Sequence, residues 1–144
     1  MRLKCDGRAL IPRPETERLV EIIIESVGDT FNGKILDLGS GTGAIILALC
    51  NQLKEARGLG MDKSREAISL SRENLCLLGL SARVSFQKFD WMLEEYKQEK
   101  VDLLISNPPY LTLEEWKLAD PEVNKHDPKD ALVSAEGGLA HLRK

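Results

Sequence analysis

The sequence is poor in the residues that build disulfide-bonded and metal-binding proteins. Its 144 residues include three cysteines and two histidines. Cys5, Cys50 and Cys76 are widely spaced and form no Cys-x-x-Cys pair. Neither a disulfide framework nor a zinc ribbon is therefore expected, and a reducing compartment fits best. His126 and His141 show no ligand spacing with each other, so we predict no metal site and expect two solvated side chains.

Long apolar runs and an excess of one charge are also missing. The strongly apolar stretches, such as residues 44–50 and 101–105, are far shorter than the roughly 20 residues of a membrane-spanning helix. We therefore expect no membrane partner. The 20 basic and 23 acidic residues leave a net charge of −3, which supplies no general field to attract nucleic acid. The first residues lack the apolar core of a secretory signal and are too short for a full transit peptide.

The composition nevertheless suits a folded domain, because 42% of the residues are hydrophobic and the length matches one domain. Residues 1–33 differ in kind from the rest. Two prolines hold residues 11–17 extended, and Thr16 is placed to cap an amphipathic helix over residues 17–27. We assign residues 1–33 to an N-terminal arm with a leading helix, and residues 34–144 to a partial catalytic domain.

From residue 34 onward, short apolar runs alternate with helical stretches, as in parallel βα units. Ser64 is expected to cap the second of these helices and Gly79 to end it. Beyond Tyr110 the pattern weakens, and residues 120–144 are expected to form a loop with a short helix at its end. The predicted strands are 35–38, 57–61, 83–89 and 101–105, and the predicted helices are 44–53 and 65–78.

A glycine-rich segment lies where the first strand would turn into a helix. It reads Asp37-Leu38-Gly39-Ser40-Gly41-Thr42-Gly43, and its glycines let a ligand approach the backbone. The same spacing fits both a dinucleotide fingerprint and an S-adenosylmethionine loop. Asp37 favours the second, because a carboxylate there can face the cationic amino group of a methionine moiety but would repel a pyrophosphate. A tight structural turn, with Asp37 capping the helix, is the alternative.

Two further acidic residues follow predicted strands. Asp62 comes about 20 residues after the loop, where its oxygens can accept both ribose hydroxyls. Its alternative is a solvated residue opening a helix. Asp90 can accept from an adenine amino group while the indole of Trp91 covers the ring, although Trp91 could equally be a core residue.

The segment Ser106-Asn107-Pro108-Pro109-Tyr110 directly follows the fourth predicted strand. A planar nitrogen is a poor nucleophile, so methylating it requires that its N–H bonds be held and its lone pair be aimed. Asn107 can accept one hydrogen through its side chain, and the carbonyl of Pro108 can accept the other. The consecutive prolines fix these acceptors, and Tyr110 can lie flat against the substrate. A proline-rich stop after a strand is the alternative.

Together with Ile-Pro-Arg-Pro-Glu-Thr-Glu at residues 11–17, these motifs resemble the HemK/PrmC-type release-factor glutamine N5-methyltransferases. The resemblance runs from about residue 10 to residue 139. It implies a parallel, Rossmann-like class I methyltransferase sheet, with S-adenosylmethionine held by residues 39–43, Asp62 and Trp91. It also implies a peptide chain release factor as partner, the glutamine of its Gly-Gly-Gln motif being held by Asn107 and Pro108, with Pro109 and Tyr110 beside it.

The chain departs from the family in its later part. The family's Glu-Pro and glycine-rich segment appears here as Asp127-Pro128 followed by residues 131–139, with some glycines replaced. The chain also ends before the last three strands of the family sheet and lacks the upstream helical domain, so we expect a fragment or short isoform. Its strands would run third, second, first, fourth. The fourth would then be an exposed edge, so we expect low stability, self-association through this edge and weak or absent catalysis.

Two other functions stay open from the sequence. One is an amino-group methyltransferase acting on adenine or guanine in nucleic acid, in which a flipped base occupies the same pocket. The acidic balance argues against it. The other is an inactive truncated form. The expected location is the mitochondrial matrix for a eukaryotic source and the cytoplasm otherwise.

Overall fold

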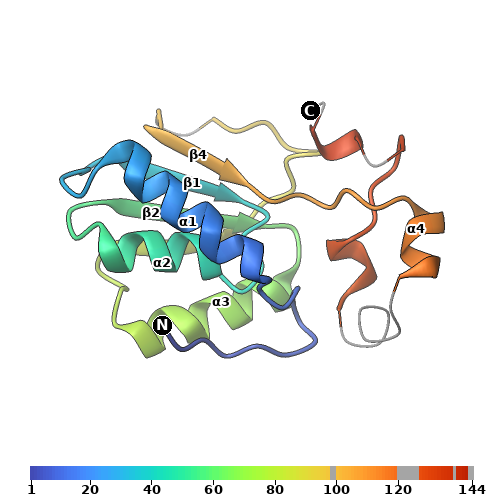
Figure 1. The fold of residues 1–144 in the computed structure, drawn as a ribbon, viewed down its shortest axis with the longest axis horizontal. Coiled ribbons are helices and arrows are strands. Elements are labelled where there is room, and N and C mark those ends of the chain that lie inside the picture. Colours follow the sequence, from blue (N-terminus) through green and yellow to red (C-terminus); the bar gives the residue numbers. More distant parts are fainter. Residues whose placement is uncertain (98–99, 120–126, 138, 143–144) are drawn as a thin grey trace.

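The computed structural model describes residues 1–97, 100–119, 127–137 and 139–142. A parallel four-stranded sheet lies at its centre, in the order β3-β2-β1-β4 (Figure 1). The strands are β1 (Lys34–Leu38), β2 (Arg57–Asp62), β3 (Val84–Lys88) and β4 (Leu103–Ser106). The predicted strand order is confirmed, and so is the position of the fourth strand at an edge of the described sheet.

The strand register aligns the ends of the strands that carry the motifs. Leu38 pairs with Met61 on one side and with Ser106 on the other. Because parallel strands share their carboxyl edge, the residues that follow these three positions emerge next to one another. They are the first glycine of the loop, Asp62 and Asn107.

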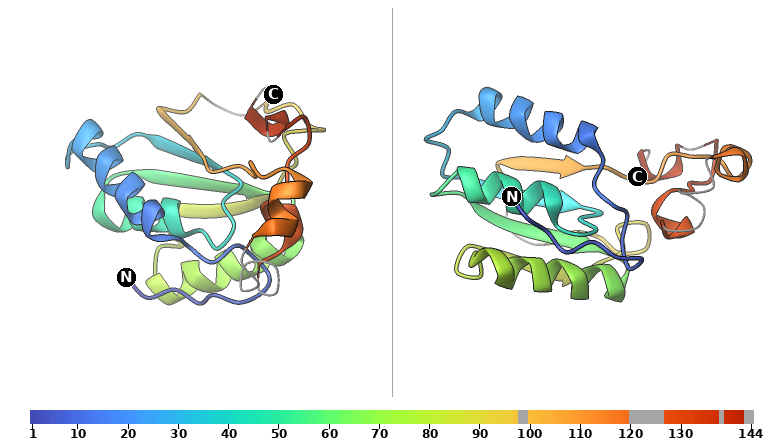
Figure 2. Two further views of the ribbon diagram at one scale, coloured as in Figure 1. Left: turned by 45° about the vertical axis from the view of Figure 1, so that its right-hand side comes forward. Right: turned by 60° about the horizontal axis from the view of Figure 1, so that its bottom comes forward.

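Three helices cover one face of the sheet: α1 (Pro14–Val27), α2 (Ala44–Gln52) and α3 (Arg65–Leu78) (Figure 2). Helix α2 is apolar almost all round, and Ile46, Leu47 and Leu49 are fully buried. Helix α3 is amphipathic and has the predicted caps, since Ser64 accepts from the backbone of Ala67 at its start and Gly79 adopts φ +66° at its end. The main hydrophobic core lies between these helices and the sheet.

The other face of the sheet is covered by the segment between β3 and β4. Leu36, Met61 and Phe89 are buried there, packed against Trp91 and other partly buried side chains. The edge strand β4 is only partly covered on this face. Leu104 shares this second face with Leu36, its partner in the register, but it is 59% exposed whereas Leu36 is buried.

The two ends of the chain differ from the sequence predictions. Helix α1 begins at Pro14, three residues before the predicted start, and Thr16 is not its cap, because proline suits the first helical position, where no N–H is needed. Helix α4 (Leu113–Leu118) was not predicted, although Thr112 and Glu115 form a capping box at its start. Of the tail, two short 3₁₀ helices are described, Lys129–Ala131 and Ala140–Leu142.

Figures 1 and 2 place α4 and the tail beyond the carboxyl ends of the strands. Leu111 forms an isolated parallel bridge with Val133, which joins the tail to the segment after β4. His126 and the preceding part of the tail lie outside the described residues. No helix among the described residues is long and apolar enough to cross a membrane.

Candidate functional site

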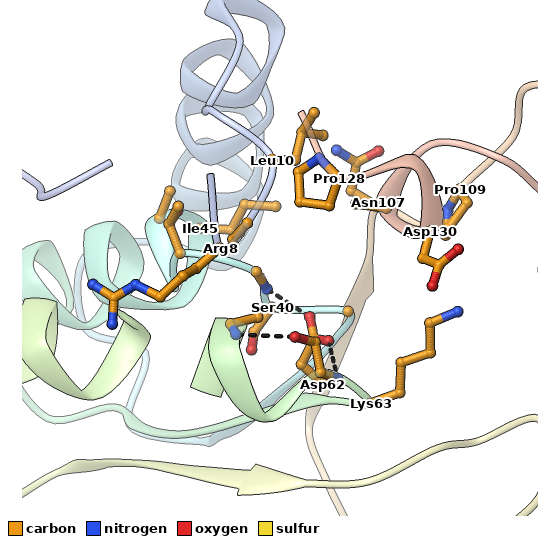
Figure 3. A pocket seen from close by; sticks show the side chains of 18 of the residues that line it. Arg8, Leu10, Ser40, Ile45, Asp62, Lys63, Asn107, Pro109, Pro128 and Asp130 are labelled. Carbon is orange, nitrogen blue, oxygen red and sulfur yellow. Dashed lines mark hydrogen bonds between the residues drawn. The ribbon is translucent and has the colours of Figure 1, made fainter. Parts of the chain in front are cut away.

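A pocket of about 490 Å³ opens at the carboxyl edge of the sheet (Figure 3). This volume is within the usual range for small-molecule sites. The wall combines the segments after β1, β2, β3 and β4 with the N-terminal arm and the tail. Of the predicted site residues, it contains Gly39, Ser40, Gly41, Thr42, Asp62, Asp90, Trp91, Asn107 and Pro109.

The glycine loop turns tightly at the end of β1. The backbone N–H groups of Gly39 and Ser40 both donate to the carbonyl of Met61, at 2.8 and 2.9 Å. Gly41 adopts φ +54°, and a Cβ there would meet only Ala9, at 3.9 Å. Gly43, at φ +82°, would place a Cβ 2.7 Å from the ring of Phe86. The first of these glycines thus leaves the backbone open to a ligand, and the second lets α2 begin close to the sheet.

Asp62 is half-buried in the wall of the pocket and organises the loops on either side of it. Its Oδ2 accepts from the N–H of Gly41 and its Oδ1 accepts from the N–H of Ser64, both at 2.9 Å (Figure 3). A carboxylate oxygen has a second acceptor position. Asp62 can therefore hold the glycine loop and still accept from a ligand's hydroxyl groups.

Asp37 lies beneath the loop and is not part of the pocket wall. Its side chain is buried, and neither carboxylate oxygen has a hydrogen-bond partner. The pKa of Asp37 is raised to about 7, mainly by burial and also by the charge of Asp62, while the nearby N–H of Ile46 acts in the opposite direction. The predicted contact of Asp37 with a bound amino group stays a prediction, because the wall gives it no direct access.

Asp90 and Trp91 follow Phe89 after the end of β3, and both line the pocket. Trp91 lines the pocket and also packs against the buried Leu36, Met61 and Phe89, so it is in part a core residue, and its contact with an adenine ring stays a prediction. Its ring would contact a Cβ at Gly39 at 3.3 Å. Asp90 Oδ1 accepts from the N–H of Met92 at 3.0 Å, which fixes the carboxylate at the rim.

The segment after β4 contributes only part of its motif to the wall. Asn107 is exposed and lines the pocket, and Pro109 is buried and lines it too. Ser106 anchors the segment, because its hydroxyl donates to the carbonyl of Leu38 at 2.9 Å. Pro108 and Tyr110 are outside the wall, and Tyr110 is 61% exposed.

Sequence reasoning missed a buried amide that joins the loop to the arm. Asn74 of α3 is fully buried, and its Nδ2 donates to the carbonyls of Thr42 and Lys4, both at 3.0 Å. Its Oδ1 accepts from the N–H of Lys4 at 2.7 Å. A single asparagine in a helix gives no local signal of such contacts, because they join residues 32 and 70 positions away.

The expectation of a solvated His141 is wrong. Its ring lines the pocket and lies edge-on to Trp91, with the ring centroids 5.8 Å apart. Its Nδ1 is 2.9 Å from the hydroxyl of the buried Ser134. Burial lowers the pKa of His141, and the charge of Lys63 adds to this while that of Asp90 opposes it.

These features fit S-adenosylmethionine. The open backbone at the glycine loop and the carboxylate of Asp62 suit the methionine and ribose parts, and the Asp90-Trp91 pair suits the adenine. The hydroxyl of Ser40 lies in the pocket wall, buried and without a hydrogen-bond partner. A bound ligand would supply that partner, since buried polar groups are rarely left unpaired.

Comparisons with known proteins agree with this assignment. The chain is 42% identical over 141 residues to the release factor glutamine methyltransferase of Vibrio cholerae serotype O1, covering 98% of this chain and 48% of that protein. It spans about half the length of the curated relatives that it matches.

Solved structures agree on the fold. The hMettl16 catalytic domain in complex with the MAT2A 3′UTR hairpin 6 matches 98% of this chain and 53% of its own at a TM-score of 0.74, with 18% identity. A Methanococcus maripaludis structure, assigned to an S-adenosyl-l-methionine-dependent methyltransferase, matches 65% of this chain and 42% of its own at a TM-score of 0.57, with 26% identity. The class I methyltransferase fold predicted from the sequence is confirmed.

Residues 16–120 match the family described as methyltransferase small domain. The match includes the glycine loop, Asp62, the Asp90-Trp91 pair and the segment after β4. The expected methyltransferase domain and its S-adenosylmethionine cofactor are confirmed by this family and by the Methanococcus maripaludis neighbour. The chain belongs to the methyltransferase small domain family.

Proposed function

We propose that this protein transfers a methyl group from S-adenosylmethionine to the side-chain amide nitrogen of glutamine in the Gly-Gly-Gln motif of peptide chain release factors. One observation carries the proposal. The glycine loop and the Asn107 segment leave neighbouring strands at paired positions, Leu38 and Ser106, and open on one pocket. A donor held by the first would lie next to an acceptor held by the second.

The cofactor supplies an electrophilic methyl group on a sulfonium. The chain's own residues bind and orient it: the open backbone of the glycine loop receives the methionine part, Asp62 accepts from the ribose hydroxyls, and Asp90 with Trp91 receives the adenine. His141 completes the wall beside Trp91.

The acceptor nitrogen is oriented by the segment after β4. Asn107 Oδ1 accepts a hydrogen bond from one amide N–H and the carbonyl of Pro108 accepts one from the other, which aims the nitrogen lone pair at the methyl carbon. As the nitrogen–carbon bond forms, the methyl–sulfur bond of the donor would break, and the nitrogen would release one proton to the solvent that reaches the exposed Asn107. The proline pair holds both acceptors in place, and the exposed ring of Tyr110 is free to lie against the amide plane. Positioning and preorganised electrostatics then supply the catalysis.

The choice of glutamine rests on the relatives. The Asn-Pro-Pro-Tyr segment indicates nitrogen chemistry, and proteins 37–42% identical to this chain are named for release factor glutamine. A net charge of −3 gives no general attraction to nucleic acid, which favours the protein substrate over a base.

A labelled-methyl assay tests the proposal. The chain is incubated with radiolabelled S-adenosylmethionine and, in separate reactions, with a release factor, with the same factor carrying asparagine for the motif glutamine, and with single-stranded DNA or RNA. We expect label in the unaltered release factor alone, at the low level that the exposed edge of the sheet predicts. Label in the nucleic acid would favour the base-methylating alternative, and no transfer to any acceptor by a chain that binds the cofactor would contradict the proposal.

A further inference from the structure

Asp127 is a buried carboxylate in the tail that contacts the N-terminal arm. Its side chain is 2% exposed. It accepts from the guanidinium of Arg13 and from the backbone N–H of Ile11, the second at 3.2 Å. These contacts join segments 114 and 116 residues apart in the chain.

The same part of the tail is also tied to the segment that follows Asn107. The N–H of Leu111 donates to the carbonyl of Leu132 at 2.9 Å, and the N–H of Ser134 donates to the carbonyl of Leu111 at 2.8 Å. The tail thus bridges the arm on one side and the acceptor segment on the other.

Both partners of the bridge contribute to the pocket. Pro12 and Arg13 line it from the arm, and Pro128 and Asp130 line it from the tail. Figure 3 shows Leu10 of the arm and Pro128 of the tail at the edge of this pocket. This part of the wall is therefore built from both arm and tail, and its shape depends on the contact between them.

We propose that Asp127 is a positioning residue that, through Arg13, fixes the wall of the cofactor pocket. The inference rests on the proposed function, because it takes the pocket to be the S-adenosylmethionine site. It gives a role to two motifs that the cofactor and acceptor loops do not use, the Pro-Arg-Pro of the arm and the Asp-Pro of the tail.

The arm is built to present Arg13 to one partner. Prolines on both sides restrict the backbone, and Arg13 itself is extended at φ −95° and ψ 158° just before α1. The side chain of Arg13 is 43% exposed whereas that of Asp127 is buried. The pair is therefore asymmetric: Arg13 can be hydrated on its own, but Asp127 without Arg13 would be an uncompensated buried charge.

This asymmetry predicts that Arg13→Gln disturbs the contact between arm and tail more than Asp127→Asn does. Arg13→Gln leaves the carboxylate buried beside a neutral partner, so the arm should separate from the tail. Asp127→Asn keeps an acceptor for the N–H of Ile11 but loses the charge. The double variant removes both charges and should be less impaired than the product of the two single effects. Asp127→Glu keeps the charge, so this variant should retain most of the ligand affinity of the parent chain.

The test is calorimetric binding of S-adenosylhomocysteine, at a temperature where circular dichroism shows every variant folded. We expect Arg13→Gln and Asp127→Asn to raise Kd about 10-fold or more, and Asp127→Glu to stay within about 3-fold of the parent chain. The matched control is Arg18→Gln, which breaks the exposed Arg18–Glu21 pair on α1 and should leave Kd unchanged. Equal Kd values for the parent and both single variants would overturn the inference.

Amide hydrogen exchange separates this result from failure of the proposed function. If the parent chain binds no S-adenosylhomocysteine, the proposed function fails. The bridge is then judged by exchange at Ile11 and Leu111. Faster exchange at both amides in Asp127→Asn than in Arg18→Gln would support the positioning of the wall by Asp127, and unchanged exchange would overturn it.

Discussion

The side-chain amide of Asn74 donates to the carbonyl of Thr42 at 3.0 Å, from the buried face of α3 to the middle of the glycine loop. The same amide group holds both backbone polar groups of Lys4. One side chain thus fixes the loop that is expected to receive the cofactor and the arm that closes over it.

Asn74→Ala is expected to lower the free energy of unfolding by roughly 2–4 kcal/mol, because it leaves buried backbone groups unpaired and opens a cavity. Urea denaturation followed by circular dichroism measures this. Gln52→Ala, at an exposed position at the end of α2, is the control and should change the value by less than about 0.5 kcal/mol. Equal losses for the two variants would show that the amide is not a structural tie.

Asp62→Ala should weaken S-adenosylmethionine binding by roughly 2–4 kcal/mol, since it removes acceptors for a ligand and the contacts that hold Gly41 and Ser64. Titration calorimetry gives the affinity. Glu66→Ala is the control and should leave the affinity unchanged. Glu66 lines the same pocket at the start of α3, but no contact with a ribose hydroxyl is predicted for it. Unchanged affinity in Asp62→Ala would rule out the ribose assignment.

Asn107→Ala should leave cofactor affinity largely intact and reduce methyl transfer by about 100-fold or more, because its expected role is to orient the acceptor nitrogen. Transfer to a release factor under single-turnover conditions measures the loss. Asn107→Asp tests the charge of the acceptor at nearly constant shape. Wild-type turnover in Asn107→Ala would contradict the mechanism.

The raised pKa of Asp37 predicts that stability falls as the pH rises. Its pKa is about 7 in the folded protein against 3.8 for the free group, so between these values the unfolded chain has released a proton that the folded chain keeps. The part of the unfolding free energy that depends on protonated Asp37 is fully present below pH 3.8. It is lost at roughly 1.4 kcal/mol per pH unit up to about pH 7.

Asp37→Asn removes this titration. The difference in unfolding free energy between the variant and the parent chain should therefore shift in favour of the variant from pH 5 to pH 8. Asp29→Asn, at an exposed position after α1, controls for the general loss of a negative charge. Parallel pH profiles for Asp37→Asn and the parent chain would contradict the expected protonation of Asp37.

The exposed edge at β4 predicts self-association. Leu104 is 59% exposed on the edge strand, and an unpaired apolar edge is a template for pairing with another chain. Sedimentation velocity over increasing concentration should show association that Leu104→Lys reduces. Leu77→Lys provides a matched control, because Leu77 is 67% exposed on α3, away from the edge. Equal effects of the two substitutions would show that general surface hydrophobicity drives association.

Features with local signals were predictable from the sequence. The glycine loop, the Ser64 and Gly79 caps and the strand order all follow from short-range patterns and a standard topology. Helix α4 also had a local signal, its capping box, but the weak apolar pattern after Tyr110 obscured it. The start of α1 depended on Pro14, whose preference for the first helical position outweighed the capping tendency of Thr16.

Contacts between distant segments were not predictable in this way. Nothing near Asp127 in the sequence indicates that its partner is Arg13, and nothing near Asn74 indicates Thr42 and Lys4. The same holds for His141, which the fold brings to Trp91. These residues decide how the pocket is closed, whereas the motifs decide which chemical groups it presents.

The bridge between arm and tail has a consequence for the order of folding. A contact between residues 116 positions apart closes a long loop, so its entropic cost is repaid only after the intervening sheet has formed. The wall of the pocket is therefore among the last parts to assemble. Any ligand that contacts both segments acts on this final step, so its binding energy is used to complete the native chain as well as to hold the ligand.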